Sequence, residues 1–355
     1  MKKLNVCVLF GGISPEHEVS LRSAESVLNH LDADKYHILP VGITKAGRWF
    51  LFCDTDYSQL PGGNWERHTG NCPVMVSPVR GEGLLCFGDE GVSVRSVDVV
   101  FPVLHGENGE DGSIQGLLQL AGIPYVGPHV AESAVAMDKT LTKLVMDSAQ
   151  IPQASWVLVR NNELPAKMDV AVTAVEEKFV YPVFVKPAGT GSSVGVSKAT
   201  DRASLEKALL NAGQYDEKIL VEEFIPGIEV EVAVMGNRSP IASICGEIDS
   251  GADFYDYDAK YVTDTSVAYI PARIDDAVAE QVREYAVKVY AAIGCQGLSR
   301  VDFFVCKETG RIVFNELNTL PGFTSISMYP KLMEASGIPY GQLLDKLIEY
   351  AMEAC

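Results

Sequence analysis

The sequence predicts an α/β domain with a doubly wound parallel sheet at the N-terminus, followed by α+β modules. In the first third of the chain, strand-like and helix-like segments alternate, which is typical of such a sheet. Residues 4–10 and 36–41 have the pattern of strands, and the segment between them has the apolar spacing of a helix. Residues 97–104 are largely apolar, as expected of a strand buried on both faces of a parallel sheet.

The pattern changes after Gly127-Pro128, which we expect to mark a domain boundary. We predict one helix over residues 131–149, and strands at 179–186 and 194–198 on either side of a glycine-rich loop. Strands dominate from residue 219 onward, apart from helices at 276–293 and 340–352. We interpret residues 53–95, rich in glycine, proline and polar side chains, as an irregular insertion.

Composition excludes some classes of function. Of 355 residues, 47% are hydrophobic, so a large core is expected, and the formal net charge is −18. An acidic chain argues against nonspecific binding to nucleic acids or anionic membranes, since such binding needs a basic surface. The eight cysteines are scattered without a CxxC pair, which favours reduced thiols and a cytoplasmic protein.

The strongest chemical pattern is a predicted hairpin near the C-terminus, in which two apolar strands flank a turn containing Gly310. Because side chains alternate along a strand, Arg300 and Asp302 share one face, as do Glu316 and Asn318. If both pairs face one cleft, their oxygens form a site suited to Mg²⁺ and phosphates. The alternative is the solvated outer face of an antiparallel sheet, where charged side chains are common.

A glycine-rich loop follows a strand that ends at Lys186. Its sequence, KPAGTGSSVG, fits neither a Walker A loop nor a dinucleotide fingerprint. A loop of this kind can still supply backbone N–H groups to phosphates, and Lys186 would add a charge. An ordinary glycine-rich turn is the alternative.

Three further segments carry polar side chains at informative places. Residues 221–229 look like an extended connection between two modules, where a flat ligand could bind, or an edge strand with solvated acids. The loops at 11–18 and 105–113 each follow a predicted strand of the first sheet, and ligands bind at such strand ends. His17 and His105 could act as acid–base groups there, or could simply orient the loops through hydrogen bonds.

Taken together, the motifs identify a family resemblance. Eight of them occur in order between residues 11 and 330: GGISPEHEVS, HGENGEDGSIQG, MDK, KPAGTGSSVG, FYDYDAKY, RVDFF, ELNTLPGFT and SMYP. This set closely resembles the D-alanine–D-alanine ligases of the ATP-grasp superfamily. The resemblance implies an N-terminal substrate domain (1–128), a central ATP-grasp module with a glycine-rich lid (129–218) and a C-terminal module (219–355). It also implies that ATP activates one D-alanine as an acyl phosphate, which a second D-alanine attacks, for peptidoglycan synthesis.

The resemblance assigns roles to individual residues. Two Mg²⁺ ions, with Mn²⁺ as an alternative, would be held by Asp302, Glu316 and Asn318. ATP would contact Lys139, Lys186, Ser193, Glu222, Phe224, Ile225, Glu229 and Lys260. Catalysis would involve Glu16, Ser192, Tyr261, Arg300 and Gly322, with Arg300 and the Gly322 N–H forming an oxyanion site. D-Alanine would contact Glu16, His105, Ser327 and Met328.

The sequence also departs from the family pattern. The glycine loop lacks the charged residue that many relatives carry before its final GSS, and Met328 stands where D-serine-using relatives tend to have a polar or basic residue. Met328 and the DYDAKY segment favour D-alanine as the second substrate. The alternatives are a D-alanine–D-serine ligase and a noncatalytic ATP-grasp nucleotide-binding protein. The resemblance also suggests a homodimer.

Overall fold

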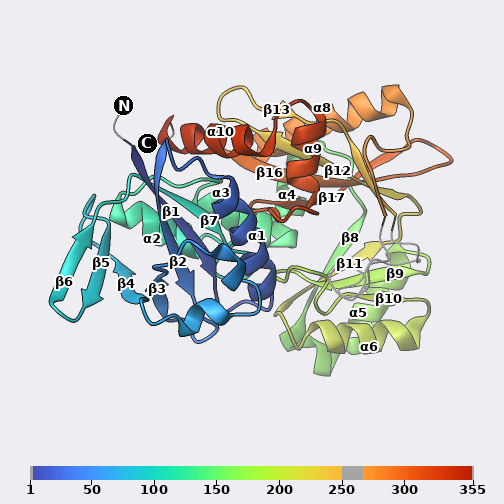
Figure 1. Cartoon of the computed structure of the whole chain (residues 1–355). Coiled ribbons are helices and arrows are strands. Elements are labelled where there is room, and N and C mark those ends of the chain that lie inside the picture. Colours follow the sequence, from blue (N-terminus) through green and yellow to red (C-terminus); the bar gives the residue numbers. More distant parts are fainter. Residues whose placement is uncertain (1–2, 250–266, 354–355) are drawn as a thin grey trace.

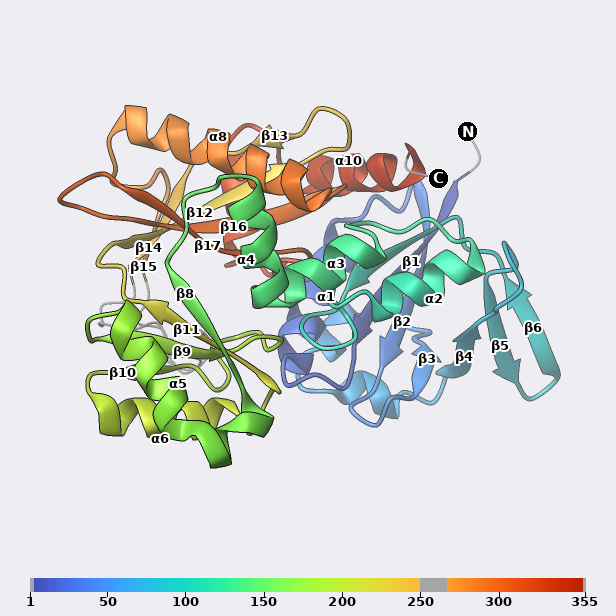
Figure 2. The ribbon, with the colours of Figure 1, turned by 180° about the vertical axis from the view of Figure 1, so that it is seen from behind.

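The computed structural model describes residues 3–249 and 267–353, which form three β-sheets with helices packed on them (Figure 1). Each sheet is built from a separate stretch of the chain, and the first and last stretches lie side by side (Figures 1 and 2). Within the described residues, no helix is both long and apolar enough to cross a membrane.

The first sheet has seven strands in the order β6-β5-β4-β3-β2-β1-β7. The predicted parallel core is confirmed, because β1 pairs in parallel with both β2 and β7. The strands are β1 (Leu4–Gly11), β2 (Tyr36–Ile43), β3 (Trp49–Leu51), β4 (Cys72–Val76), β5 (Leu84–Gly88), β6 (Gly91–Arg95) and β7 (Val99–Val103). Helices of this part are α1 (His17–His30), α2 (Ser113–Ala121) and the 3₁₀ turns η1 (Tyr57–Gln59) and η2 (Asn64–Arg67).

The prediction of an irregular insertion at residues 53–95 is wrong. Strands β4, β5 and β6 extend the sheet by antiparallel pairing. The strands are only five residues long and contain proline, cysteine and glycine, which weakens the pattern by which a strand is found. Trp65, from the 3₁₀ turn η2, is fully buried against Phe10 of β1, so this segment also contributes to the core.

The second sheet has four strands in the order β10-β9-β11-β8 and one covering layer of helices. Its strands are β8 (Trp156–Arg160), β9 (Val183–Pro187), β10 (Ser197–Ala199) and β11 (Lys218–Glu223), and its helices are η3 (Asn161–Glu163), α5 (Leu164–Lys178) and α6 (Arg202–Ala212). The expected boundary at residue 218 falls where β11 begins, yet β11 pairs inside this sheet. The domain boundaries themselves stay a prediction.

Two helices, α3 (Val130–Met137) and α4 (Lys139–Ser148), connect the first two sheets where one helix was predicted. The break lies at Asp138, whose backbone is extended and whose carboxylate accepts hydrogen bonds from the N–H groups of Thr140 and Leu141. Asp138 therefore caps α4. Because the cap starts a new helix at Lys139, the lysines at the beginning of α4 are directed toward the second sheet.

The third sheet has the order β15-β14-β12-β16-β17, with β13 paired to β12. Its strands are β12 (Ile228–Met235), β13 (Ile241–Ala242), β14 (Gly246–Asp249), β15 (Val267–Tyr269), β16 (Leu298–Val305) and β17 (Ile312–Asn318). The predicted hairpin of β16 and β17 is confirmed. The helices are α8 (Asp276–Ile293), α9 (Met328–Ala335) and α10 (Tyr340–Glu353).

One hydrophobic core joins the first and third sheets. Leu343, Leu344 and Leu347 of α10 pack together with α1 and with Val6 and Val8 of β1. The same cluster contains Leu298 of the third sheet. Helix α10 therefore lies across the N-terminal sheet near both chain ends (Figure 2). This shared core fixes the third sheet against the first, while the second sheet keeps its own core under α5 and α6.

Candidate functional site

A cavity of about 830 Å³ lies between the second and third sheets. Its lining comes from β9, β11, β12 and β17, from the start of α4 and from the glycine-rich loop. Ten of the residues predicted from the sequence line it: Lys139, Lys186, Ser192, Ser193, Glu222, Phe224, Ile225, Glu229, Glu316 and Asn318. Side chains from residue 139 to residue 318 thus meet around one cleft.

The hairpin of β16 and β17 supplies one wall. Arg300 pairs with Asn318 and Asp302 with Glu316 across the two strands, so the four side chains share a face as the alternation predicts. Asp302 has no exposed surface. Arg300 donates Nε to Oδ1 of Asp302 at 2.8 Å and Nη2 to Oδ2 at 2.7 Å, and the Asn318 amide donates to Oδ2 at 3.0 Å. Asp302 is therefore held in place by a two-point contact, and Glu316 and Asn318 line the cavity whereas Arg300 and Asp302 do not.

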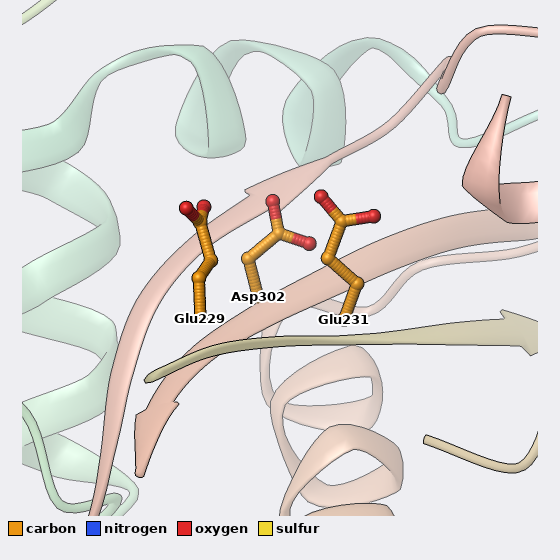
Figure 3. A group of neighbouring side chains, drawn as sticks. All are labelled: Glu229, Glu231 and Asp302. Carbon is orange, nitrogen blue, oxygen red and sulfur yellow. The ribbon is translucent and has the colours of Figure 1, made fainter. Parts of the chain in front are cut away.

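Three carboxylates gather at this wall. One oxygen each of Glu229, Glu231 and Asp302 lies within 4.8 Å of the others, and the three side chains point the same way from neighbouring strands (Figure 3). The strand register explains the group, since Glu231 lies opposite Asp302 and Glu229 is two residues away on the same face. Arg300 Nε is 3.2 Å from Glu231, which offsets part of the charge.

The chemistry of this wall fits a divalent cation. Carboxylate and amide oxygens are the ligands that Mg²⁺ prefers, and Asp302, Glu316, Asn318, Glu229 and Glu231 supply them here. Sequence reasoning missed Glu231. The signal was available, because Glu229 and Glu231 are separated by one residue of the strand and must lie on one face.

The opposite wall carries lysines. Lys186 on β9 lies 2.6 Å from Oε2 of Glu222, and Lys143 on α4 lies 2.5 Å from Oε1 of the same carboxylate. Burial alone would raise the pKa of Glu222, but the charges and hydrogen bonds of Lys143 and Lys186 outweigh it and lower the pKa to about 2. Burial would lower the pKa of Lys186, and the charge of Glu222 overcomes this and raises it. Glu222 and Lys186 are therefore both ionised.

The glycine-rich loop crosses from the second sheet toward the first. Ser192 and Ser193 adopt left-handed backbone conformations, with φ of 51° and 58°. The Ser192 hydroxyl donates a hydrogen bond to Glu16, which lies 176 positions earlier in the chain. Lys139 donates to the Thr190 carbonyl oxygen at 2.5 Å. Residues 194–196 form turns rather than the predicted strand, because β10 begins only at Ser197.

Glu16 sits in the loop after β1, and this loop depends on a glycine. Gly11 has φ of +89°, and a Cβ atom there would lie 2.1 Å from the Ile43 carbonyl oxygen of the neighbouring strand. Any other residue would push β1 and β2 apart. Glu16 also approaches Gly106 of the second loop, where an added Cβ would lie 2.5 Å from its Oε2. The two predicted loops thus meet at one end of the first sheet.

His105 is buried between this crevice and the third sheet. Its Nδ1 lies 3.1 Å from the Leu320 carbonyl oxygen, and its Nε2 lies 3.2 Å from the Ser23 hydroxyl. A carbonyl only accepts, so Nδ1 carries the proton and Nε2 accepts from Ser23. Burial lowers the pKa of His105, which keeps the ring neutral. Both ring nitrogens therefore bond to chain atoms, which links the loop at 105–113 to α1 and to the segment after β17.

The segment that follows β17 brings Gly322 and Ser327 together. A Cβ atom at Gly322 would lie 2.8 Å from the Ser327 hydroxyl, so a larger residue would displace Ser327. The Ser327 hydroxyl accepts from the Thr324 N–H at 3.0 Å. Met328 is buried in the shared core and faces Gly246, where an added Cβ would lie 2.3 Å from its terminal methyl. The predicted residues Lys260 and Tyr261 lie outside the described residues.

Glu110 was also missed as a site residue. It accepts a hydrogen bond from the Gly106 N–H at 2.7 Å and lines the cavity near Glu16. Burial first, and then the negative charge of Glu16, raise the pKa of Glu110 to about 8. Glu110 therefore keeps its proton near neutral pH, at the end of the cleft where the loops of the first sheet meet.

The raised pKa of Glu110 predicts a pH dependence of stability. The folded protein holds this proton more tightly than the unfolded chain, so the stabilisation is full below a pH of about 4.5 and is lost as the pH rises toward 8. Glu110→Gln stays neutral. Its free energy of unfolding, measured in urea, should rise relative to the wild type between a pH of about 5 and about 8. A difference that is flat over this range contradicts the prediction; the exposed Glu107→Gln serves as control.

Comparison with known proteins gives a consistent result over the whole chain. The family model "D-ala D-ala ligase N-terminus" matches residues 5–128, and "D-ala D-ala ligase C-terminus" matches residues 145–349. A curated D-alanine--D-alanine ligase of Acetivibrio thermocellus is 50% identical, with 99% of this chain and 96% of that protein covered. One of Caldicellulosiruptor bescii is 49% identical, with the same coverage of both chains.

Solved structures agree with these sequence matches. The VanG D-Ala:D-Ser ligase of Enterococcus faecalis superimposes with a TM-score of 0.90 at 39% identity, covering 99% of this chain and all of that one. The D-alanine-D-alanine ligase of Coxiella burnetii gives 0.84 at 35% identity, covering 99% and 96%. With its ATP-grasp architecture and both family models matched, this chain belongs to the D-alanine–D-alanine ligase family.

Proposed function

We propose that this protein uses ATP to join two D-alanine molecules into D-alanyl-D-alanine, the dipeptide used in peptidoglycan precursors. One observation carries the proposal: a single cleft brings the oxygen-rich face of the β16–β17 hairpin opposite Lys139 and Lys186. The loop that covers this cleft is hydrogen-bonded to Glu16 of the first domain. This hydrogen bond links the proposed phosphate site to Glu16, the carboxylate proposed to bind the amino group of the first D-alanine.

The nucleotide would occupy the cavity between the second and third sheets. Lys139, Lys186 and the loop at Ser193 would receive its phosphates, and Lys260 would join them. Phe224, Ile225 and Glu222 would contact the adenine at the connection between β11 and β12, and Glu229 the ribose. Residues 222–229, which form that connection, line the cavity, and this supports the proposed positions of the adenine and the ribose.

The hairpin oxygens would hold the metal. Asp302, Glu316 and Asn318 are the proposed ligands, and Glu229 and Glu231 stand close enough to Asp302 to contribute. Bound Mg²⁺ would neutralise the charge of the phosphates. We propose two such ions, with Mn²⁺ able to replace them.

Other residues would orient the amino acids. Glu16 would receive the ammonium group of the first D-alanine, and Ser192 and Tyr261 would hold the covering loop against it. The γ-phosphate would pass to the carboxylate of that D-alanine, giving an acyl phosphate. Exclusion of water matters because this intermediate hydrolyses. The amine of a second D-alanine, bound through its carboxylate near Ser327, would then attack the acyl carbon.

Arg300 and the Gly322 N–H would stabilise the oxyanion of the tetrahedral intermediate. Asp302 fixes the plane of the guanidinium through Nε and Nη2. A donor held in advance costs no reorganisation when negative charge develops, which is why such groups accelerate acyl transfer. We propose further that His105 lies beside the substrates, that the three predicted domains act together, and that the enzyme works in the cytoplasm as a homodimer.

D-Alanyl-D-serine is a second candidate product, because one structure to which this chain is similar is a D-Ala:D-Ser ligase. We propose D-alanine as the second substrate because the apolar Met328 directly follows Ser327, where a polar side chain would suit D-serine. An apolar pocket distinguishes a methyl from a hydroxymethyl group by only about 1–3 kcal/mol, so the preference has to be measured.

The assay for the proposed function is phosphate release coupled to product analysis. With ATP and Mg²⁺, release should require D-alanine and should match the D-alanyl-D-alanine formed. In an equal mixture of D-alanine and D-serine, the D-alanine dipeptide should predominate. Nucleotide binding without D-alanine-dependent release would leave only a noncatalytic nucleotide-binding protein.

Arg300→Lys tests the oxyanion assignment. Lysine keeps the charge but has no planar fork, so it cannot reproduce the two-point contact with Asp302. We expect kcat to fall at least about tenfold, which corresponds to ~1.4 kcal/mol of lost transition-state stabilisation. Arg202→Lys is the matched control, since Arg202 pairs with Asp169 and Glu176 on the surface of the second domain. A loss no larger than in this control would reduce Arg300 to a structural role.

A further inference from the structure

Lys143 has no role in the reaction proposed above, yet it is one of the most buried charged residues of the described chain. Its side chain is 3% exposed. It lies on α4 one turn after Lys139, so the two lysines share a helix face. Its Nζ lies 2.5 Å from Oε1 of Glu222 and 3.4 Å from the Ala154 carbonyl oxygen. Lys139, Lys186 and Glu222 line the cavity, whereas Lys143 lies outside that lining.

Glu222 therefore sits between two ammonium groups. Lys143 contacts Oε1 from the buried side. Lys186 contacts Oε2 at 2.6 Å from the side of the cavity, and the Lys186 side chain is 17% exposed. Two cations and one anion leave one net positive charge in this group of three. Charges in a partly desolvated site act on a ligand much more strongly than charges in water. The excess charge is thus presented to the cavity through Lys186.

Without Lys143, Glu222 and Lys186 would form a simple ion pair of opposite charges. If Glu222 had Lys186 as its one partner, the two opposite charges would largely cancel at the position of a ligand phosphate. The carboxylate would also pull the ammonium away from the cavity. By pairing with one oxygen of Glu222, Lys143 reduces the share of the Glu222 charge that offsets Lys186, which also feels the charges of Glu229 and Glu316.

We propose that Lys143 is a positioning residue for nucleotide phosphates, which acts through Glu222 and Lys186 without touching the ligand. This inference rests on the proposed function only for the identity of the ligand, ATP. The competing explanation is structural: Lys143 would simply fix Glu222 and the adenine-binding connection after β11. In the proposal, Lys143 affects the binding of the phosphates. In the structural explanation, it affects the binding of the adenine.

The decisive variant is Lys143→Met, which keeps most of the side-chain volume and removes the charge. Glu222 stays paired with Lys186, so no buried charge is left alone and the fold should be retained. Isothermal titration calorimetry would compare ATP with adenosine, both in excess Mg²⁺ and without D-alanine. We expect the Kd of ATP to rise about tenfold or more. Adenosine, which has no phosphates, should change less than about twofold.

A second variant restores the charge. Lys143→Met combined with Glu222→Gln leaves Lys186 as one net positive charge, as in the wild-type group. The ratio of ATP affinity to adenosine affinity should return toward the wild-type ratio, even if both ligands bind more weakly through the lost carboxylate. Lys143→Arg keeps the cation and should also keep this ratio, which tests the proposal should the methionine variant fail to fold.

The control for overall charge is Lys207→Met on α6, an exposed lysine outside the cavity lining, and it should leave the ratio unchanged. Equal weakening of ATP and adenosine in Lys143→Met would show a structural role, and an unchanged Kd of ATP would also overturn the proposal. Because ligation is not measured, an inactive wild-type enzyme would contradict the proposed function and leave this test intact.

Discussion

The site depends on the compensation of buried carboxylates by buried cations. Asp302 has no exposed surface and Glu222 has little, and ionised groups in such places are costly unless they are paired. Arg300 meets Asp302 through two hydrogen bonds, and two lysines share Glu222. These pairs fix Lys186, which lines the cleft, and Arg300 and Lys143, which lie behind its lining. Acids on the third sheet and lysines on the second are thereby positioned before a ligand arrives, so little reorganisation is needed when phosphates bind.

This arrangement is made by contacts between distant parts of the chain. Ser192 meets Glu16 across 176 positions, and the Phe323 N–H donates to Ser23 across 300. The second contact belongs to the core that joins the first and third sheets, whereas the first is made by a loop of the separately packed second sheet. The second sheet, which carries the glycine-rich loop, is therefore the part best able to move relative to the first and third sheets.

Local periodicity predicted much of the fold and part of the site. The hairpin of β16 and β17 follows from apolar alternation, and that alternation also places Asp302 and Glu316 on one face. Other features depend on tertiary pairing. The strands in residues 72–95 are short and irregular in pattern, and only the pairing of β4 with β3, of β5 with β4 and of β6 with β5 reveals them. In the sequence, Lys143 looks like an ordinary helix lysine, and only the packing of the second sheet on α4 buries it beside Glu222. The raised pKa of Glu110 comes first from burial and then from Glu16 in another loop, and neither can be predicted from local sequence.

We propose that the oxygen-rich face of the β16–β17 hairpin binds a divalent cation together with the nucleotide. Electron paramagnetic resonance of Mn²⁺ in the presence of ATP measures this directly, because bound and free Mn²⁺ give different signals. Glu316→Gln keeps the shape of the side chain and removes one anionic ligand, and Asp169→Asn, 92% exposed on α5, is the control. We expect the nucleotide complex of Glu316→Gln to bind Mn²⁺ at least about tenfold more weakly than the control. Equal binding of Mn²⁺ by the two variants would contradict it.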